Sequence, residues 1–323
     1  MKARGILILA IILFQVFVNS PAFAAEQFVL VIDAGHGGKD PGAVSGKNYE
    51  KDVNLAVAQR AGALIAANCK DVKIVYTRKD DRFVELNKRA DIANKANADL
   101  FISIHCNSAD NKSARGTETY LLGSDPKRTN DNLNVAMAEN KAILYESDYK
   151  TNYAGYDPNS PESMIIFEFM QSEYQKESLR MAQLVQDQLT LYAKRPNRGV
   201  KQAGFLVLWK SAMPSILIEL GYLSNVDECK YMVSKKGVEE LAQSIYRGFK
   251  KYLAEVKARQ VQIVPAKQTN TPAPATPATK PAETKPAVAP VPAKQPQQTK
   301  QSKTTLYYRK VTHLSIYSAH IYK

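Results

Sequence analysis

Between residues 26 and 256, short β-branched apolar runs alternate with longer stretches in which apolar residues recur every three or four positions. The short runs predict strands at 28–33, 73–77, 100–104, 117–122, 205–208 and 215–220. The longer stretches predict helices at 53–67, 84–98, 175–193 and 238–256. This alternation predicts an α/β fold, a three-layer sandwich in which helices flank a mixed, largely parallel sheet.

The first 25 residues have the pattern of a secretory signal peptide. Lys2 and Arg4 precede an apolar stretch over 5–18, and Ala22-Phe23-Ala24 supplies the small residues of a cleavage site. The stretch is shorter than the roughly 20 residues of a spanning helix, which favours cleavage over retention as an anchor. We therefore expect export to the periplasm or cell wall, with no transmembrane anchor after cleavage.

The amino-acid composition changes in the C-terminal part of the chain. Nine of the sixteen prolines lie within 261–303, among Ala, Thr, Lys and Gln, so 257–303 is predicted to be a disordered linker. Residues 304–323 are too few for an independent domain. The body, 26–256, is within the size range of a single domain.

The net charge of +13 lies mainly outside the body. Residues 257–323 contribute +10 and residues 1–25 contribute +2, which leaves 31 bases against 30 acids in residues 26–256. A balanced body lacks the basic surface that nucleic-acid binding requires, so no nucleic-acid partner is expected. The three cysteines, Cys69, Cys106 and Cys229, have no CxxC spacing; buried free thiols are expected, and pairing of Cys69 with Cys229 stays open.

Four residues with metal or acid–base chemistry lie at strand ends or a helix start. His36 follows the first strand, Glu50 opens a helix, His105 ends the third strand and Glu219 lies in the strand at 215–220. Taken singly, each has an ordinary structural explanation, as a turn residue, a helix-start charge or a core histidine. Glu219 is the exception, because a carboxylate between Ile218 and Leu220 in a buried strand is costly unless it is paired or catalytic.

Together the four residues predict a hydrolytic zinc site. Two imidazoles and one carboxylate are typical ligands of catalytic zinc and leave a position for water, while a second carboxylate can accept the proton of that water. His36, Glu50, His105 and Glu219 supply these parts. Cys106 adjoins His105, but neighbours along a strand point to opposite faces, so it is not expected to be a ligand.

Several segments match one known family, in the same order along the chain. They are Val31–Gly42 (VIDAGHGGKDPG), Glu50–Leu55 (EKDVNL), Thr77-Arg78 with Asp81, Leu86 with 89–94, Ser103–Asn107 and Ile218–Asn225 (IELGYLSN). With these motifs the body resembles the zinc-dependent N-acetylmuramoyl-L-alanine amidases (amidase type 3) of cell-wall turnover and daughter-cell separation.

The resemblance implies a function for each of the four residues. His36, Glu50 and His105 would bind zinc, and Glu219 would be the catalytic carboxylate. The implied substrate is peptidoglycan, cleaved at the amide between the lactyl group of N-acetylmuramic acid and L-alanine. Cys106 departs from the small alanine that is usual in the family, which should not affect the metal.

Residues 123–172 form a long insertion after the strand at 117–122, with an amphipathic stretch over 133–145. A solvated surface excursion is the plainer interpretation. In the division amidases that the chain resembles, an inserted helix covers the cleft and a glutamate can occupy the fourth zinc position. We therefore expect 123–172 to be a regulatory lid on which an activator protein acts, with Glu139 or Glu146 as the blocking ligand.

Two other classes of function are open on the sequence alone. A zinc carboxypeptidase or endopeptidase could use the same residues, and a catalytically silent wall-binding protein could keep the fold. Retention of Glu219 with all three candidate ligands argues against the silent protein. The C-terminal residues 304–323 begin with a segment that resembles the first strand of a sporulation-related peptidoglycan-binding repeat, so a truncated repeat is expected there.

Overall fold

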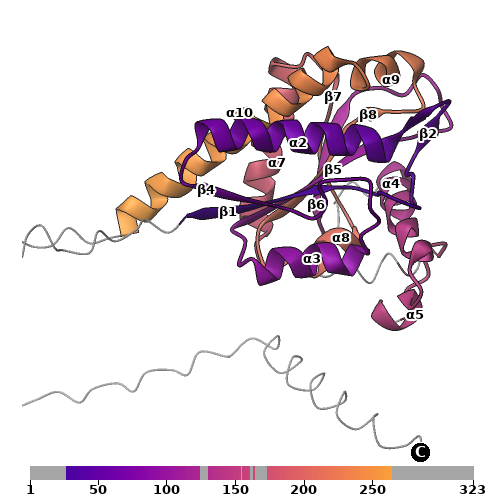
Figure 1. Cartoon of the computed structure of the whole chain (residues 1–323), viewed down its shortest axis with the longest axis horizontal. Coiled ribbons are helices and arrows are strands. Elements are labelled where there is room, and N and C mark those ends of the chain that lie inside the picture. Colours follow the sequence, from indigo (N-terminus) through magenta and orange to yellow (C-terminus); the bar gives the residue numbers. More distant parts are fainter. Residues whose placement is uncertain (1–26, 124–129, 154, 161–162, 164–172, 264–323) are drawn as a thin grey trace, which may run out of the picture. The chain divides into compact units, whose positions relative to one another are not determined.

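The computed structural model describes residues 27–123, 130–153, 155–160, 163 and 173–263 (Figure 1). The expected signal peptide, the expected stub and residues 264–303 of the expected linker lie outside the described residues. The last helix, α10, runs over Lys235–Ile263 and so continues through the first residues of the segment predicted as linker. Among the described residues, no helix combines the length and apolar character that crossing a membrane requires.

The centre of the fold is a six-stranded sheet in the order β4-β1-β5-β8-β6-β7. Its strands are β1 (Phe28–Ala34), β4 (Val72–Tyr76), β5 (Leu100–Asn107), β6 (Thr117–Leu122), β7 (Asn197–Ala203) and β8 (Ser215–Tyr222). The pairs from β4 to β8 are parallel, β6 runs antiparallel to β8, and β7 is parallel to β6. The predicted mixed, largely parallel sheet is confirmed.

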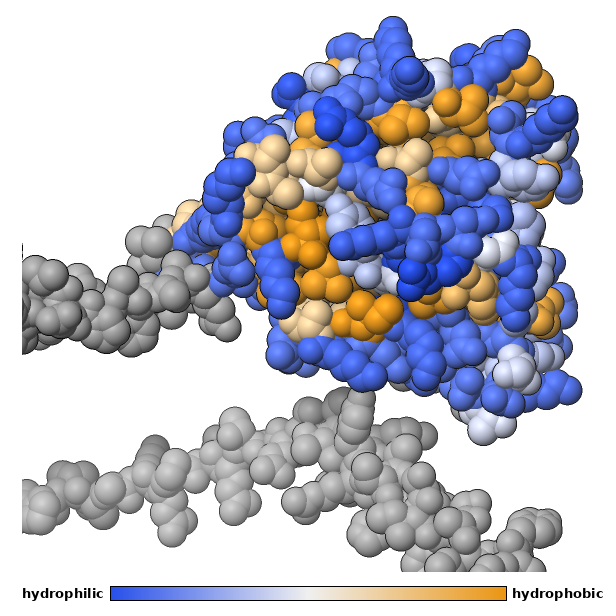
Figure 2. Space-filling view, viewed as in Figure 1, coloured by the Kyte–Doolittle hydropathy of each residue, from blue (hydrophilic) through white to orange (hydrophobic). Residues whose placement is uncertain are grey.

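Helices cover both faces of the sheet (Figure 1). The helices α2 (Glu50–Asn68), α7 (Gln175–Leu191) and α10 lie on one face, and α3 (Leu86–Lys95) and the single turn α8 (Leu206–Trp209) lie on the other. Successive side chains of β1 point to opposite faces of the sheet. Leu30 and Ile32 therefore pack with α2 and α10, while Val31 packs on the face covered by α3. Hydrophilic side chains cover most of the molecular face in Figure 2, with hydrophobic residues in smaller patches between them.

The strand predicted at 205–208 is wrong. That apolar run forms α8 and packs against α3, because a short apolar run has no period that separates a strand from a buried helical turn. The edge of the sheet is instead β7, a polar and only partly buried strand that pairs with β6. The hairpin of β2 (Val44–Ser45) and β3 (Asn48–Tyr49) and the short helix α9 (Val226–Met232) are not predicted by the sequence pattern.

A buried ion pair joins the end of β1 to α3. Asp33, at the end of β1, accepts a 2.8 Å hydrogen bond from Arg89 Nη1 of α3, and both side chains are at most 1% exposed. Hydroxyls of Thr77 and Ser103 also donate to this carboxylate, at 2.5 and 2.6 Å. Burial alone would raise the pKa of Asp33, but Arg89 and the two hydroxyls outweigh it and hold that pKa below its ordinary value.

We expect Arg89→Met to lower the free energy of unfolding by about 3–5 kcal/mol, because it leaves the Asp33 carboxylate buried without a partner. Urea denaturation followed by circular dichroism measures the change. The matched control is Arg60→Met, which removes an arginine from the exposed pair with Glu239 and should cause no resolvable change. Equal losses in the two variants would contradict this account of the buried pair.

Candidate metal centre

The candidate residues are aligned across neighbouring strands. His105 of β5 is paired in register with Glu219 of β8, and Glu219 is paired with Glu118 of β6. Partners in register present their side chains on the same face of a sheet, so the three lie in one row. Gly35 extends the row beyond β1, and a Cβ atom there would lie 2.3 Å from the His105 ring. The absent side chain is therefore what makes room for the imidazole.

The turn after β1 places His36 beside this row. Its backbone has φ of 60°, a left-handed conformation that a residue with a side chain adopts only under constraint. Arg89 Nη2 donates to the His36 carbonyl at 2.8 Å, and Arg78 donates to the carbonyls of Ala34 and Gly35, each at 2.8 Å. Two buried arginines therefore hold the turn in place.

Neighbouring groups orient both His36 and Glu50. Asp40 Oδ2 lies 2.8 Å from His36 Nδ1, which directs Nε2 into the site. The Glu50 carboxylate accepts hydrogen bonds from Ala43 N, Cys106 N and Asn54 Nδ2 at 2.8, 2.9 and 3.1 Å. Its position is thus set by the β2–β3 region, by β5 and by its own helix.

Four side chains converge on one point. Potential ligand atoms of His36, Glu50, His105 and Glu139 all lie within 4.8 Å of one another. Glu50 Oε1 is 3.1 Å from His36 Nε2 and 3.2 Å from His105 Nδ1. Glu139 Oε2 is 2.9 and 2.7 Å from the same two nitrogens. The two imidazoles and Glu50 predicted from the sequence are thus brought together, and Glu139 joins them from α4 (Asn130–Asn140).

Burial and carboxylates act in opposite directions on the two histidines. Burial would lower the pKa of each, but Glu50 and Glu139 outweigh it for His36, whose pKa stands well above its ordinary value. The same carboxylates, Glu139 foremost, raise the pKa of His105 to about 9. Two buried acids thus draw positive charge to this point, which protons on the rings or a bound cation can supply.

Glu219 is a fully buried acid, and neither of its carboxylate oxygens has a hydrogen-bond partner among the described residues. Burial first, and then repulsion from Glu139 and Glu50, raises its pKa well above the ordinary value. Such a group in a native core calls for a ligand or a catalytic function. A cation held by the adjacent cluster would lower that pKa, so the donor set and the unpartnered acid both fit a metal site.

The structure does not bring Glu146, the other candidate blocking ligand, to the cluster. It follows η1 (Lys141–Tyr145), and its carboxylate accepts hydrogen bonds from Leu86 N at 2.8 Å and Tyr153 Oη at 3.0 Å. Asn140 fastens the same segment, since its side chain donates to Gly204 O and accepts from Leu206 N, both at 2.9 Å. Glu146 and Asn140 therefore anchor the segment that presents Glu139.

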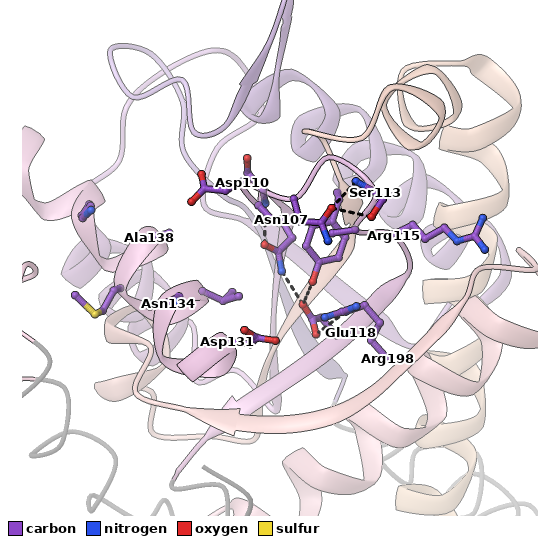
Figure 3. A pocket seen from close by; sticks show the side chains of 17 residues that line it. Asn107, Asp110, Ser113, Arg115, Glu118, Asp131, Asn134, Ala138 and Arg198 are labelled. Carbon is purple, nitrogen blue, oxygen red and sulfur yellow. Dashed lines mark hydrogen bonds and ion pairs between the residues drawn. The ribbon is translucent and has the colours of Figure 1, made fainter. Parts of the chain in front are cut away.

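Beside the candidate metal site lies a polar cavity of about 1050 Å³, between α4, the loop 107–115 and the start of β6 (Figure 3). Glu118 stands at its base, held by Asn107 and Tyr222. Asp40, Asn54 and Glu118 are site residues that were not predicted from the sequence. Asp40 could have been predicted, because it is a carboxylate four residues after a candidate histidine ligand. Glu118 could not, because its position in the site depends on the register of β6 with β8.

Comparison with known proteins identifies the family. A family model described as N-acetylmuramoyl-L-alanine amidase matches residues 30–251. The N-acetylmuramoyl-L-alanine amidase AmiC of Escherichia coli O6:H1 is 33% identical over 231 residues, which cover 71% of this chain and 54% of AmiC. The chain therefore spans about half the length of that relative.

Two solved structures have the same fold. An N-acetylmuramoyl-L-alanine amidase from Clostridium difficile 630 gives a TM-score of 0.53 at 30% identity, covering 71% of this chain and 98% of that one. The CwlD amidase of Clostridioides difficile, solved in complex with the GerS lipoprotein, gives a TM-score of 0.51 at 27% identity, covering 71% and 100%. With most of its length matched by the family model, the chain belongs to the N-acetylmuramoyl-L-alanine amidase family.

Proposed function

We propose that this protein is a zinc-dependent amidase that hydrolyses the bond between the lactyl group of N-acetylmuramic acid and L-alanine in peptidoglycan. The observation that carries the proposal is the convergence of His36, Glu50 and His105 beside Glu219, a buried carboxylate without a hydrogen-bond partner among the described residues. Membership of the amidase family supports the choice of substrate. The proposed setting is cell-wall turnover and daughter-cell separation.

The side chains divide the chemistry between them. His36, Glu50 and His105 would hold zinc, which, when bound, polarises the scissile carbonyl and acidifies water. Glu219 acts as general base, taking a proton from the attacking water and delivering it to the departing amide nitrogen. The products are the free lactyl carboxylate and a stem peptide with a free amino group on L-alanine. Asp40 orients the His36 ring throughout.

We propose that α4 is a lid and that Glu139 blocks the metal site. The support is geometric, because Glu139 Oε2 lies within 2.9 Å of both candidate histidine nitrogens and occupies the place of a fourth ligand. The segment is packed on the body through buried Ala136 and Ile143, so moving it has a cost in apolar contact. An enzyme built in this way keeps only a low basal activity until something displaces α4.

An activator protein that acts on the segment 123–172 is the proposed source of that displacement. The CwlD amidase, which has the same fold, was solved in complex with the GerS lipoprotein, which supports a protein partner for this fold. The proposed location is the periplasm or the cell wall, following the signal-peptide pattern of residues 1–25. We propose no nucleic-acid partner.

Substitution of the general base tests the reaction. We expect Glu219→Gln to reduce kcat on purified muropeptides by about 10²–10⁴-fold, the usual contribution of a general base, with zinc content unchanged. The control is Glu239→Gln, an exposed glutamate on α10, with wild-type turnover expected. Product analysis should show intact stem peptide released from glycan. Cleavage within the peptide would instead identify a carboxypeptidase or endopeptidase, and equal wall clearance by wild type and Glu219→Gln would contradict the assignment.

Metal removal gives an independent test. Dialysis against a chelator should abolish muropeptide hydrolysis, and addition of zinc should restore it, because two imidazoles and a carboxylate favour zinc over magnesium or calcium. Metal analysis of the untreated protein is expected to find zinc, and the variant His105→Ala should lose it. Full activity in metal-free protein would overturn the zinc assignment.

The lid is tested by Glu139→Gln, which removes the charge but keeps the packing of α4. Loss of one charge-assisted contact of about 1.5–3 kcal/mol should raise basal hydrolysis roughly ten- to a hundredfold. The matched control is Glu146→Gln, which retains an acceptor for Leu86 N and should leave basal hydrolysis low. A deletion of residues 130–165 should also raise it. Unchanged basal activity in a folded deletion would remove the lid from the proposal.

A further inference from the structure

At the base of the polar cavity, one buried carboxylate, Glu118, is paired with two cationic side chains. The Glu118 carboxylate, 1% exposed, accepts hydrogen bonds from Asn107 Nδ2 at 2.6 Å, Tyr222 Oη at 2.9 Å and Arg198 Nε at 3.3 Å. Lys201 completes this set with an ion pair to the same carboxylate. One buried acid is thus matched with two cations, which leaves one positive charge uncompensated at this point.

Arg198 is the cation that is free to bind an anion. Lys201 points its ammonium at Glu118, whereas Arg198 uses only Nε, and within the described part of the chain its terminal nitrogens donate to no group. The guanidinium is held over the Tyr222 ring, 5.0 Å from the ring centroid, and its side chain is 32% exposed. It therefore presents a fixed pair of donors to the cavity, the geometry that carboxylates favour (Figure 3).

The site is close to the reacting atoms. Glu118, which holds Arg198, is the in-register neighbour of Glu219 across β6 and β8, and such neighbours have Cβ atoms about 5 Å apart. Arg198 therefore stands two side chains away from the proposed general base. A substrate whose scissile amide lies at Glu219 would extend its next residues into this cavity.

The other charged groups of the cavity are less suited to this task. Arg115 is exposed, and Figure 3 shows it directed away from Glu118. Asp131 of α4 and Lys141 of η1 belong to the proposed lid and would move away with it. In the part of the chain that the structure describes, no ion pair links Asp131 to Arg198. Asp110 lies on the loop 107–115, and Figure 3 shows this residue on the far side of the cavity from Arg198.

We propose that Arg198 binds a carboxylate of the stem peptide, close to L-alanine, and makes this amidase selective for anionic stems over amidated ones. The inference rests on the proposed function, which supplies the peptide. Substrates that carry the charge gain a bidentate contact with Arg198, and substrates with a carboxamide in its place do not.

The test measures affinity for two ligands of equal size. They are N-acetylmuramoyl-L-alanyl-D-glutamic acid and its diamide, titrated calorimetrically into full-length protein carrying Glu139→Gln and Glu219→Gln, so that the lid glutamate does not compete and neither ligand is hydrolysed. We expect the acid to bind about ten- to a hundredfold more tightly than the diamide. Adding Arg198→Gln should bring the ratio to about one, and Arg198→Lys should restore part of it.

The matched control is Arg115→Gln, which removes one positive charge from the same cavity and should keep the preference for the acid. A merely structural function for Arg198 would weaken both ligands alike and leave their ratio unchanged, which would overturn the inference. Equal affinities in the parent protein, or no binding of either ligand, would overturn it as well. If the preference is found but the active enzyme cleaves no muropeptide, the proposed function fails and the carboxylate site stands.

Discussion

The site depends on one constraint, the buried pairing of Asp33 with Arg89. This pair is costly to desolvate, and it is retained where β1 ends and the chain must turn sharply. Arg89 also donates to the His36 carbonyl, so the same guanidinium that neutralises Asp33 holds the strained residue whose side chain faces the candidate metal site. A hydrophobic replacement of the pair could preserve the fold, but it would release the turn.

A second constraint is the register of the central strands. Because β5, β8 and β6 are paired so that His105, Glu219 and Glu118 form one row, the proposed metal ligand, the proposed general base and the carboxylate that holds Arg198 lie side by side. A slip of one residue in β8 would turn Glu219 to the opposite face. The pairing of these three strands therefore sets which side chains lie next to the proposed general base.

The α4 helix adds a further carboxylate, Glu139, to the buried charges around the two imidazoles. Glu50, Glu139 and Glu219 are buried around two imidazoles, and the repulsion among the acids is relieved only by positive charge. Glu139 arrives on a segment whose anchors, Asn140 and Glu146, bind the body through backbone groups of α8 and α3. Docking of the segment and occupation of the site are thus mechanically joined, since whatever pulls the anchors away removes Glu139 too.

Local pattern determined a large part of this protein. Runs of apolar residues located β1, β5 and β8 and the helices between them, and the placing of His36, Glu50, His105 and Glu219 at the ends of those elements predicted which side chains would meet. The local hydrophobic pattern is sufficient to predict this meeting, because it locates the strand ends, and strands of a parallel sheet bring their carboxyl ends to one edge. Tertiary structure alone decided that 205–208 is a helical turn, that Glu139 and not Glu146 reaches the cluster, and that Arg198 stands beside Glu118. Each of these outcomes depends on contacts between segments far apart in the chain, such as the 103 residues that separate His36 from Glu139, and no local period encodes how such segments dock.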